Sequence, residues 1–422
     1  MNADRFRTHT LRDERILRVL ASAIQAVEPG KLTRHHLQRT PLPPHRRLFL
    51  LGVGKAAEAM TFAASQFLDR VTDSLVITKH ASRGTSGLPR VIESGHPVPD
   101  ERSLAAGRAA LEFASKLNED DLLLCLISGG GSALMTYPRP GISLDEMQQL
   151  TSSLLASGAA IHEINAIRRQ LDQIKGGGLA RRTKARVLGL ILSDVPGNSL
   201  KVIASGPTVQ SKAAPEEGMQ IIKKYSIQVT PGIRQALMGQ IPYDESLEKR
   251  VQNIIIGDLH TAAQTAQRQA AQEGFDSSVI DLNLQGEARE AGLNLAKKLK
   301  QEREKKKGPF CLIAGGETTV TLHGNGKGGR NQELALSAVD ELSGVQDLLF
   351  VSLATDGDDG PTDAAGAVVN GETRQRAERL GMSAADYLSG NDAYGYFDPL
   401  NDLIKCGHSG TNVNDLVFLL GL

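Results

Sequence analysis

The stretch Arg47-Leu-Phe-Leu-Leu-Gly-Val-Gly-Lys-Ala-Ala57 joins a short apolar run to a glycine turn and then to residues that favour a helix. It predicts a buried strand over residues 47–52 and a helix over residues 56–68. The same order returns where the apolar run 121–127 ends in Ser128-Gly-Gly-Gly-Ser132. Short apolar runs that alternate with amphipathic helices are typical of parallel sheets covered by helices on both faces. We therefore predict an α/β fold with mostly parallel sheets.

The size and charge of the chain narrow the classes of protein to which it can belong. With 422 residues it is long enough for two or three domains of about 150 residues each. Its 48 basic and 48 acidic residues cancel, which argues against a dedicated nucleic-acid-binding protein. The longest fully apolar run, residues 122–127, is far shorter than the roughly 20 residues that span a bilayer. We therefore expect a protein that binds neither nucleic acid nor membrane.

Two further features of the sequence indicate a cytoplasmic protein. The N-terminus has no apolar segment of the kind found in secretory signals. The three cysteines are widely spaced and odd in number, so they predict neither a disulfide framework nor a zinc site.

The turn around Gly54 and Lys55 fits the dinucleotide pattern G-x-G-x-x-G/A. That pattern also needs an acidic residue at the end of the second strand, where this chain has Thr78, Lys79 and His80. A helix N-terminus also binds phosphate or carboxylate, and Lys55 would add a positive charge there. The other interpretations, an NAD(P)H site and a plain tight turn with a solvated lysine, stay open.

A second glycine turn follows the apolar run 121–127. Ser128, Gly129, Gly130, Gly131 and Ser132 could line a concavity with backbone amides that accept anionic oxygens. The residues after Ser132 do not complete the Gly-x-Ser-x-Gly pattern of a hydrolase, and the chain has no P-loop pattern. This turn therefore predicts a different kind of anion site.

Acidic residues stand at the predicted carboxyl ends of two strands. Asp194 follows the run 186–192, and Asp356 and Asp358 follow the run 348–353. Carboxylates at this edge of a sheet could hold Mg²⁺ or accept a proton. The alternatives are an Asx-type turn at Asp194 and an acidic surface turn at Asp356.

Two further clusters lie in the last third of the chain. Gly315, Gly316 and Glu317 fall between predicted strands, and Lys327 and Arg330 precede a helix that starts near residue 331. Basic residues beside a positive helix N-terminus indicate an anion site, although a plain loop is the alternative. A late Gly/Thr/Asn cluster covers residues 407–415, while His96, like the other histidines, has no partner spacing that singles it out.

Together these features favour phosphoryl transfer. That reaction needs cations to spread the charge of the transferred group and carboxylates to hold Mg²⁺. Both kinds of group occur in turns that follow predicted strands.

Taken together, these clusters make the chain resemble a known family, the glycerate 2-kinases, which are glycerate kinases with a C-terminal MOFRL domain. The matching segments run in order over nearly the whole chain: residues 52–56, 126–134, 165–168, 173–179, 192–197, 202–208, 314–318, 328–334, 355–362 and 410–413. One departure is the segment 406–410, Cys-Gly-His-Ser-Gly, where the family more often has a Gly-Pro-Thr-Gly-type run.

The resemblance implies transfer of the γ-phosphoryl group of ATP to the 2-hydroxyl of D-glycerate, with Mg²⁺, to give 2-phospho-D-glycerate. It also implies two α/β domains with Rossmann-like sheets and an active-site cleft between them. We expect a glycerate kinase domain over residues 1–240 and a MOFRL-type domain over residues 250–422. The family's catalytic lysine and arginine fall on Lys55 and Arg330.

To these two residues we add Asp194 as a catalytic base or metal ligand and Asp356 as a metal ligand. The expected substrate- and nucleotide-binding residues are Gly54, Ser128, Gly129, Gly130, Gly131, Ser132, Arg168, Lys175, Gly315, Gly316, Glu317, Lys327, Asn331, Thr411 and Asn412. Which turn binds ATP and which binds glycerate stays open, as does a homodimer. An NAD(P)H-dependent hydroxypyruvate reductase and a non-catalytic protein that binds a phosphorylated metabolite are the alternative functions.

Overall fold

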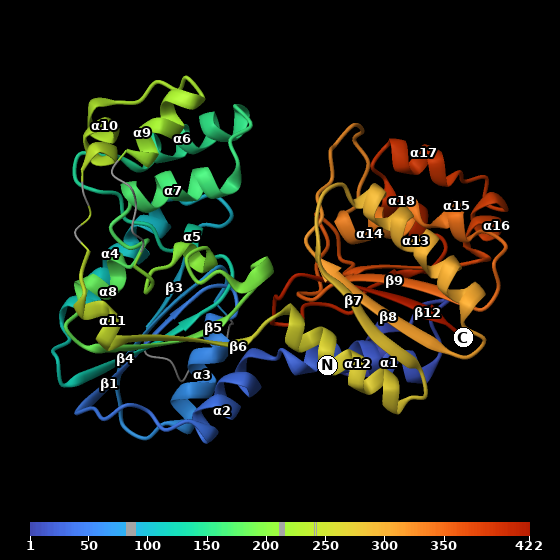
Figure 1. The fold of residues 1–422 in the computed structure, drawn as a ribbon, viewed down its shortest axis with the longest axis horizontal. Coiled ribbons are helices and arrows are strands. Elements are labelled where there is room, and N and C mark those ends of the chain that lie inside the picture. The colour runs from blue at the N-terminus through green and yellow to red at the C-terminus, as the bar shows by residue number, and fades with distance from the viewer. Residues whose placement is uncertain (82–89, 211–215, 240, 242) are drawn as a thin grey trace. The chain divides into compact units, whose positions relative to one another are not determined.

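The computed structural model describes residues 1–81, 90–210, 216–239, 241 and 243–422, and it contains two compact units (Figure 1). One comprises Pro29–Ile256, and we call it the parallel-sheet unit. The other comprises Met1–Glu28 and Gly257–Leu422, and we call it the mixed-sheet unit. These units differ from the sequence ranges 1–240 and 250–422 in two places. The first 28 residues belong to the mixed-sheet unit, and residues 250–256 belong to the parallel-sheet unit. Residue 240 lies outside the described residues.

The parallel-sheet unit is built on a six-stranded sheet of order β3-β2-β1-β4-β5-β6. The pairings of β1 with β2 and β4, of β2 with β3 and of β4 with β5 are all parallel, as the continuous apolar runs predict. In the register of β1 and β4, Val53 pairs with Ile127, so the two glycine turns that follow these strands begin side by side. The strands are β1 Arg47–Val53, β2 Val71–Thr78, β3 Val91–Glu93, β4 Asp121–Ile127, β5 Arg186–Leu192 and β6 Val251–Gly257.

Helices form two separate hydrophobic clusters in this unit. One packs on the sheet around Phe49, Phe113 and Leu123, and the other joins α6, α7, α9 and α10 (Figure 1). The helices are α2 Pro29–Arg39, α3 Ala57–Phe67, α4 Glu101–Ser115, α5 Gly131–Leu134, α6 Leu144–Ala156, α7 Ile161–Leu171, α8 Gly178–Arg182, α9 Glu217–Lys224, α10 Pro231–Met238 and α11 Ser246–Arg250, with short 3₁₀ turns η2 Pro196–Asn198 and η3 Ile203–Ser205.

The mixed-sheet unit has a six-stranded sheet of order β11-β10-β9-β12-β8-β7. β7 and β8 are parallel, but β12 runs antiparallel to both β8 and β9, and β10 is antiparallel to β9 and β11. Parallel neighbours need a crossover, usually a helix, whereas β12 enters the sheet from a loop. The expectation of mostly parallel strands therefore describes the first sheet and not the second. The strands are β7 Asp276–Leu284, β8 Phe310–Gly316, β9 Leu348–Ala354, β10 Gly366–Asn370, β11 Leu403–Ile404 and β12 Asp415–Gly421.

Helices cover both faces of the mixed sheet, with α1 and α12 on one face and α13 and α14 on the other (Figure 1). The apolar face of α1, which includes Ile16, Leu17 and Leu20, is fully buried, and α1 packs along α12. The helices are η1 Ala3–Phe6, α1 Glu14–Ala26, α12 Leu259–Gln272, α13 Ala288–Lys305, α14 Arg330–Ser337, α15 Val339–Leu342, α16 Thr373–Glu378, α17 Ala384–Ser389 and α18 Ala393–Phe397. In the described part of the chain, no helix combines the length and apolar character that crossing a membrane requires.

Candidate functional site

The two glycine turns at the ends of β1 and β4 are interlocked. The Lys55 amide donates to the Gly129 carbonyl at 2.9 Å, and the Ala56 amide donates to Ser128 Oγ at 3.0 Å. Gly54 has a φ of +125°, and a Cβ at this position would lie 2.2 Å from Ser128 Oγ. Glycine is therefore required at residue 54 both by its backbone conformation and by the close approach of the second turn.

The outer side of this pair of turns is available to a ligand. In the described residues, the backbone amides of Gly129 and Gly130 have no recorded protein acceptor, and Gly130 has a φ of +86°. The Lys55 side chain is exposed and passes Gly130, where a Cβ would lie 3.4 Å from Lys55 Cγ. Free amides beside a positive charge are suited to bind anionic oxygens.

Asp194 lies against the same turn. A Cβ at Gly129 would lie 1.9 Å from Asp194 Oδ2, so the carboxylate nearly touches the backbone of Gly129. In the described part of the chain, no group of three or more His, Cys, Asp or Glu side chains could hold a metal ion. Mg²⁺ in phosphoryl-transfer sites often uses one or two carboxylates together with the phosphates of the substrate. Asp194 therefore fits a Mg²⁺ ion that is shared with a bound phosphate.

The C-terminal end of this turn contacts the segment around Ser205. Ser132 Oγ and Ser205 Oγ are 2.8 Å apart, and a Cβ at Gly131 would lie 2.8 Å from the Ala204 Cβ. Ala204 and Ser205 have φ values of +49° and +59°, which residues with a side chain rarely adopt. Strained backbone of this kind is often found at functional sites.

His96, which the spacing of the histidines did not single out, also lies at this turn. A Cβ at Gly130 would lie 3.1 Å from the Cδ2 atom of its ring. Burial lowers the pKa of His96 to about 4, and the charges of Lys55 and Lys79 add to this effect. The imidazole is therefore neutral at pH 7 and can present an N–H group to an anion.

Arg168 and Lys175, both expected binding residues, line a cavity of about 320 Å³ that we call the helix-layer pocket. Lys175 is buried, and its Nζ atom donates to Asp172 Oδ2 at 2.6 Å and to Thr136 Oγ1 at 3.1 Å. Burial lowers the pKa of Lys175, although the charge of Asp172 opposes this. Arg168 is half-buried, and no hydrogen bond or ion pair of its guanidinium is recorded among the described residues. The apolar wall consists of Pro97, Val98, Pro99, Leu144, Met147 and Leu155.

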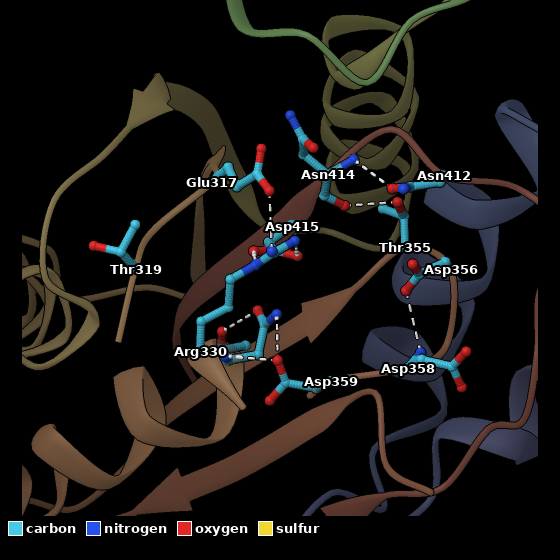
Figure 2. Close-up of polar contacts among 12 residues, drawn as sticks. Glu317, Thr319, Arg330, Thr355, Asp356, Asp358, Asp359, Asn412, Asn414 and Asp415 are labelled. Atoms are coloured by element: carbon cyan, nitrogen blue, oxygen red, sulfur yellow. Dashed lines mark hydrogen bonds and ion pairs between the residues drawn. The ribbon is translucent and has the colours of Figure 1, made fainter. Parts of the chain in front are cut away.

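In the mixed-sheet unit, Arg330 is held by two carboxylates (Figure 2). Its Nε atom donates to Asp415 Oδ2 at 2.5 Å and its NH2 group to Asp415 Oδ1 at 3.1 Å, while its NH1 group donates to Glu317 Oε1 at 3.1 Å. Burial alone would lower the pKa of Arg330, but the charge of Asp415 and the hydrogen bonds to it outweigh burial and raise it. An arginine has more N–H donors than these contacts use, so Arg330 can also bind an anion.

The start of α14, expected to bind an anion, already has an acceptor within the protein. The amides of Asn331 and Gln332 donate to the two carboxylate oxygens of Asp359 at 3.0 and 2.9 Å (Figure 2). Asn331 is buried, and its side chain also accepts a hydrogen bond from Ser352 at 2.7 Å. Burial raises the pKa of Asp359 to about 7, although the hydrogen bonds from the two amides oppose this rise.

The acidic turn after β9 points away from Arg330 in Figure 2. Asp356 Oδ1 accepts the Asp358 amide at 3.1 Å, which is an Asx-type turn, and Asp358 Oδ2 lies 2.9 Å from His408 Nδ1. A role for Asp356 in holding metal stays a prediction.

The remaining expected binding residues of this unit have local partners. Lys327 lies over the ring of Tyr394, with its Nζ atom 4.1 Å from the ring centroid. Gly315 and Gly316 end β8, and the buried Thr411 donates to the Val27 carbonyl at 2.6 Å. Asn412 Oδ1 accepts the Asn414 amide at 3.1 Å.

The structure thus brings Lys55, the 128–132 turn and Asp194 together in the parallel-sheet unit, and Arg330 and Glu317 together in the mixed-sheet unit. Sequence reasoning missed His96, Asp359 and Asp415. The two aspartates follow Gly-rich or Asn-rich turns, as many structural aspartates do. What distinguishes them is their pairing with residues far away in the sequence: Asp359 binds a residue 28 positions away, and Asp415 binds one 85 positions away.

The sequence matches two known domain families and several proteins of nearly equal length. Residues 15–238 match DUF4147, a domain of unknown function, and residues 310–415 match the MOFRL family. A D-glycerate 2-kinase from Thermotoga maritima is 40% identical over 410 residues, which cover 95% of this chain and 96% of the relative. A glycerate 2-kinase from Pyrococcus horikoshii is 36% identical, and the match covers 96% of this chain and 96% of the relative. The crystal structure of a glycerate kinase from Thermotoga maritima matches this chain with a TM-score of 0.90 at 40% identity. The match covers 97% of this chain and 99% of the chain in that structure.

Proposed function

The chain belongs to the glycerate kinase family with a C-terminal MOFRL domain, and we propose that it uses ATP to phosphorylate the 2-hydroxyl of D-glycerate. The product is 2-phospho-D-glycerate. The observation that carries this conclusion is the 40% identity to a D-glycerate 2-kinase over 95% of the chain. We infer that the glycerate kinase domain is built on the parallel-sheet unit, Pro29–Ile256, and the MOFRL-type domain on the mixed-sheet unit, Met1–Glu28 and Gly257–Leu422.

Lys55 steadies the phosphoryl group that is transferred. Its exposed side chain passes Gly130, and in the described residues the amides of Gly129 and Gly130 have no protein acceptor, so phosphate oxygens could be bound by several positive groups at once. Fixed cations and amides of this kind stabilise charge in the transition state because they need no reorganisation when the reaction occurs.

Arg330 neutralises the charge that develops during transfer. Asp415 holds one edge of its guanidinium through Nε and the NH2 group, and Glu317 accepts from the NH1 group, so the remaining N–H groups point in a defined direction. Arginine is suited to this task because its planar group binds phosphate and carboxylate oxygens in pairs.

Asp194 holds Mg²⁺ or accepts the proton of the 2-hydroxyl. When bound, Mg²⁺ neutralises negative charge on the phosphates and orients them for transfer. The position of the Asp194 carboxylate against Gly129 supports this assignment, because a carboxylate there is next to the amides that we assign to phosphate. Of the expected metal ligands, Asp194 fits this role better than Asp356, whose carboxylate closes its own turn.

The expected location is the cytoplasm, and the substrates are D-glycerate and ATP. A hydroxypyruvate reductase is the less favoured function, because β2 ends at Thr78 and is followed by Lys79 rather than by an acid that could bind the ribose of NAD(P)H.

The test is a phosphorus NMR spectrum of the purified protein with ATP, Mg²⁺ and D-glycerate. A growing 2-phosphoglycerate signal together with ADP is the expected result. A 3-phosphoglycerate signal would keep the kinase but overturn the position of attack. If no phosphate moves while NADH is oxidised with hydroxypyruvate, the protein is a reductase.

A further inference from the structure

The helix-layer pocket has the shape and lining of a site for a small, partly apolar ligand. Its volume of about 320 Å³ lies within the range of about 300–1,000 Å³ that is common for such sites. Val98 and Leu155 line it with 61% and 60% of their surfaces exposed. Apolar side chains left open to solvent in a pocket indicate that a ligand covers them.

The pocket is continuous with the turn that we assign to phosphate. Ser132 and Ala133 line it, and they directly follow Gly131 at the end of that turn. The two sides of the pocket are tied together, because the Gln148 side chain of α6 donates to the Pro99 carbonyl. A ligand that filled the pocket would therefore extend naturally from the turn.

The charge of the pocket is positive. Asp172 pairs with Lys175 and offsets its charge, whereas the half-buried Arg168 has no recorded ion pair among the described residues. The pocket thus combines apolar and polar lining residues with one guanidinium that has no ion pair in the described part of the chain.

We infer that the helix-layer pocket receives the adenine and ribose of ATP, and that the 128–132 turn receives its phosphates. This inference rests on the proposed function. An adenine ring has flat apolar faces that the wall of Val98, Met147 and Leu155 can cover. Glycerate has a carboxylate and two hydroxyl groups and little apolar surface, so a largely apolar wall offers it few partners. The pocket therefore assigns the turn in the parallel-sheet unit to ATP.

The test compares two exposed apolar residues on the same helical cluster. Leu155→Glu puts a negative charge on the pocket wall, and Met238→Glu does the same at a residue that is 65% exposed and does not line the pocket. We measure the Kd of ADP with Mg²⁺ by calorimetry in the absence of glycerate, and the KM of D-glycerate at saturating ATP. Leu155→Glu should raise the Kd of ADP by about tenfold or more and change the KM of glycerate by less than about twofold. Met238→Glu should change neither value.

A second variant fills the space without adding charge. Thr151→Trp, on the α6 side of the pocket, should raise the Kd of ADP in the same way and leave inhibition by inorganic tripolyphosphate unchanged. The inference is overturned if both pocket variants bind ADP like the wild type, or if they raise the KM of glycerate instead. Because ADP binding needs no turnover, the Kd values of the pocket variants and of Met238→Glu still test the inference if the NMR experiment shows no kinase activity, which would overturn the proposed function alone.

Discussion

The two glycine turns that carry a basic residue look alike in sequence but have different surroundings. At the end of β1, Lys55 is exposed, and the nearby amides of Gly129 and Gly130 have no recorded acceptor in the described residues. At the start of α14, Asp359 accepts the amides that would bind an anion, and Asp415 and Glu317 hold Arg330. A basic residue in a glycine turn therefore indicates an anion site only where the N–H groups of the turn are still free.

The difference suggests two ways of presenting a cation. The first turn presents an exposed lysine and backbone amides to an external anion. The second turn holds its arginine in one orientation with an internal carboxylate. The amides at the start of its helix already donate to another internal carboxylate, so they are not available to an external anion. Substitutions that separate the two roles should therefore change stability in one turn and not in the other.

Removal of Arg330 should have the largest effect, because it removes a charge stabiliser and also leaves a buried carboxylate without its partner. We expect Arg330→Ala to lose about a hundredfold or more in turnover. We also expect it to lose about 3 kcal/mol in the free energy of unfolding, because breaking a buried pair leaves Asp415 unpaired. Steady-state kinetics and denaturant unfolding measure the two effects.

The double variant Arg330→Ala/Asp415→Asn is the control for this pair. It should recover part of the stability and none of the turnover. If Arg330→Ala is folded and turns over normally, Arg330 has no part in catalysis.

Removal of Lys55 should give a similar loss of turnover without a loss of stability. We expect Lys55→Ala to lose about a hundredfold in turnover because the turn keeps its amides but loses its positive charge. The thermal midpoint should not change, because the Lys55 side chain is exposed. Lys55→Arg, which keeps the charge, should retain more turnover than Lys55→Ala. A clear drop in the midpoint of Lys55→Ala would contradict the contrast between the two turns.

Asp359 makes the stability of the mixed-sheet unit depend on pH. Its pKa rises on folding from the ordinary value of 3.8 to about 7. Between pH 3.8 and pH 7, the folded state therefore holds a proton that the unfolded state has lost. The contribution of this group to stability is therefore largest at low pH and falls as the pH rises towards 7. Asp359→Asn removes this dependence, so its thermal midpoint relative to the wild type should rise by a few degrees from pH 5 to pH 8. A difference that is constant or falls with pH would show that Asp359 is ionised throughout.

Much of the fold could be predicted because its strands are buried. β1, β4 and β5 are continuous apolar runs, and parallel register places the turns that follow β1 and β4 next to each other. The antiparallel entry of β12 could not be predicted, because the path of a loop and not a local pattern decides it. The packing of α1 on α12 was also not predictable, because an amphipathic helix shows its apolar face but not its partner.

The site was predictable to the extent that it depends on local turns. Lys55, the 128–132 turn and Asp194 follow strands directly, and the structure brings them together. By contrast, the acceptor for the start of α14 comes from Asp359, 28 residues further along the chain, and no local spacing indicates that pairing. Sequence patterns show which groups a turn contains, and only the fold shows which of them are already occupied.

The smallest predicted effect concerns Lys327, the other basic residue of the second turn. Its Nζ atom lies 4.1 Å from the ring centroid of Tyr394, and its amide donates to Asp392 Oδ1 at 3.0 Å, so local contacts account for its position. Because an exposed cation–π contact stabilises by only about 0.5–1 kcal/mol, we expect Lys327→Ala to change turnover and the KM of ATP and of glycerate by less than about threefold. Lys405→Ala is the matched control, since Lys405 donates to the hydroxyl of the same tyrosine at 2.9 Å. A tenfold rise in either KM for Lys327→Ala, but not for Lys405→Ala, would show that the second turn binds substrate through Lys327 and that the two turns are more alike than their hydrogen bonds indicate.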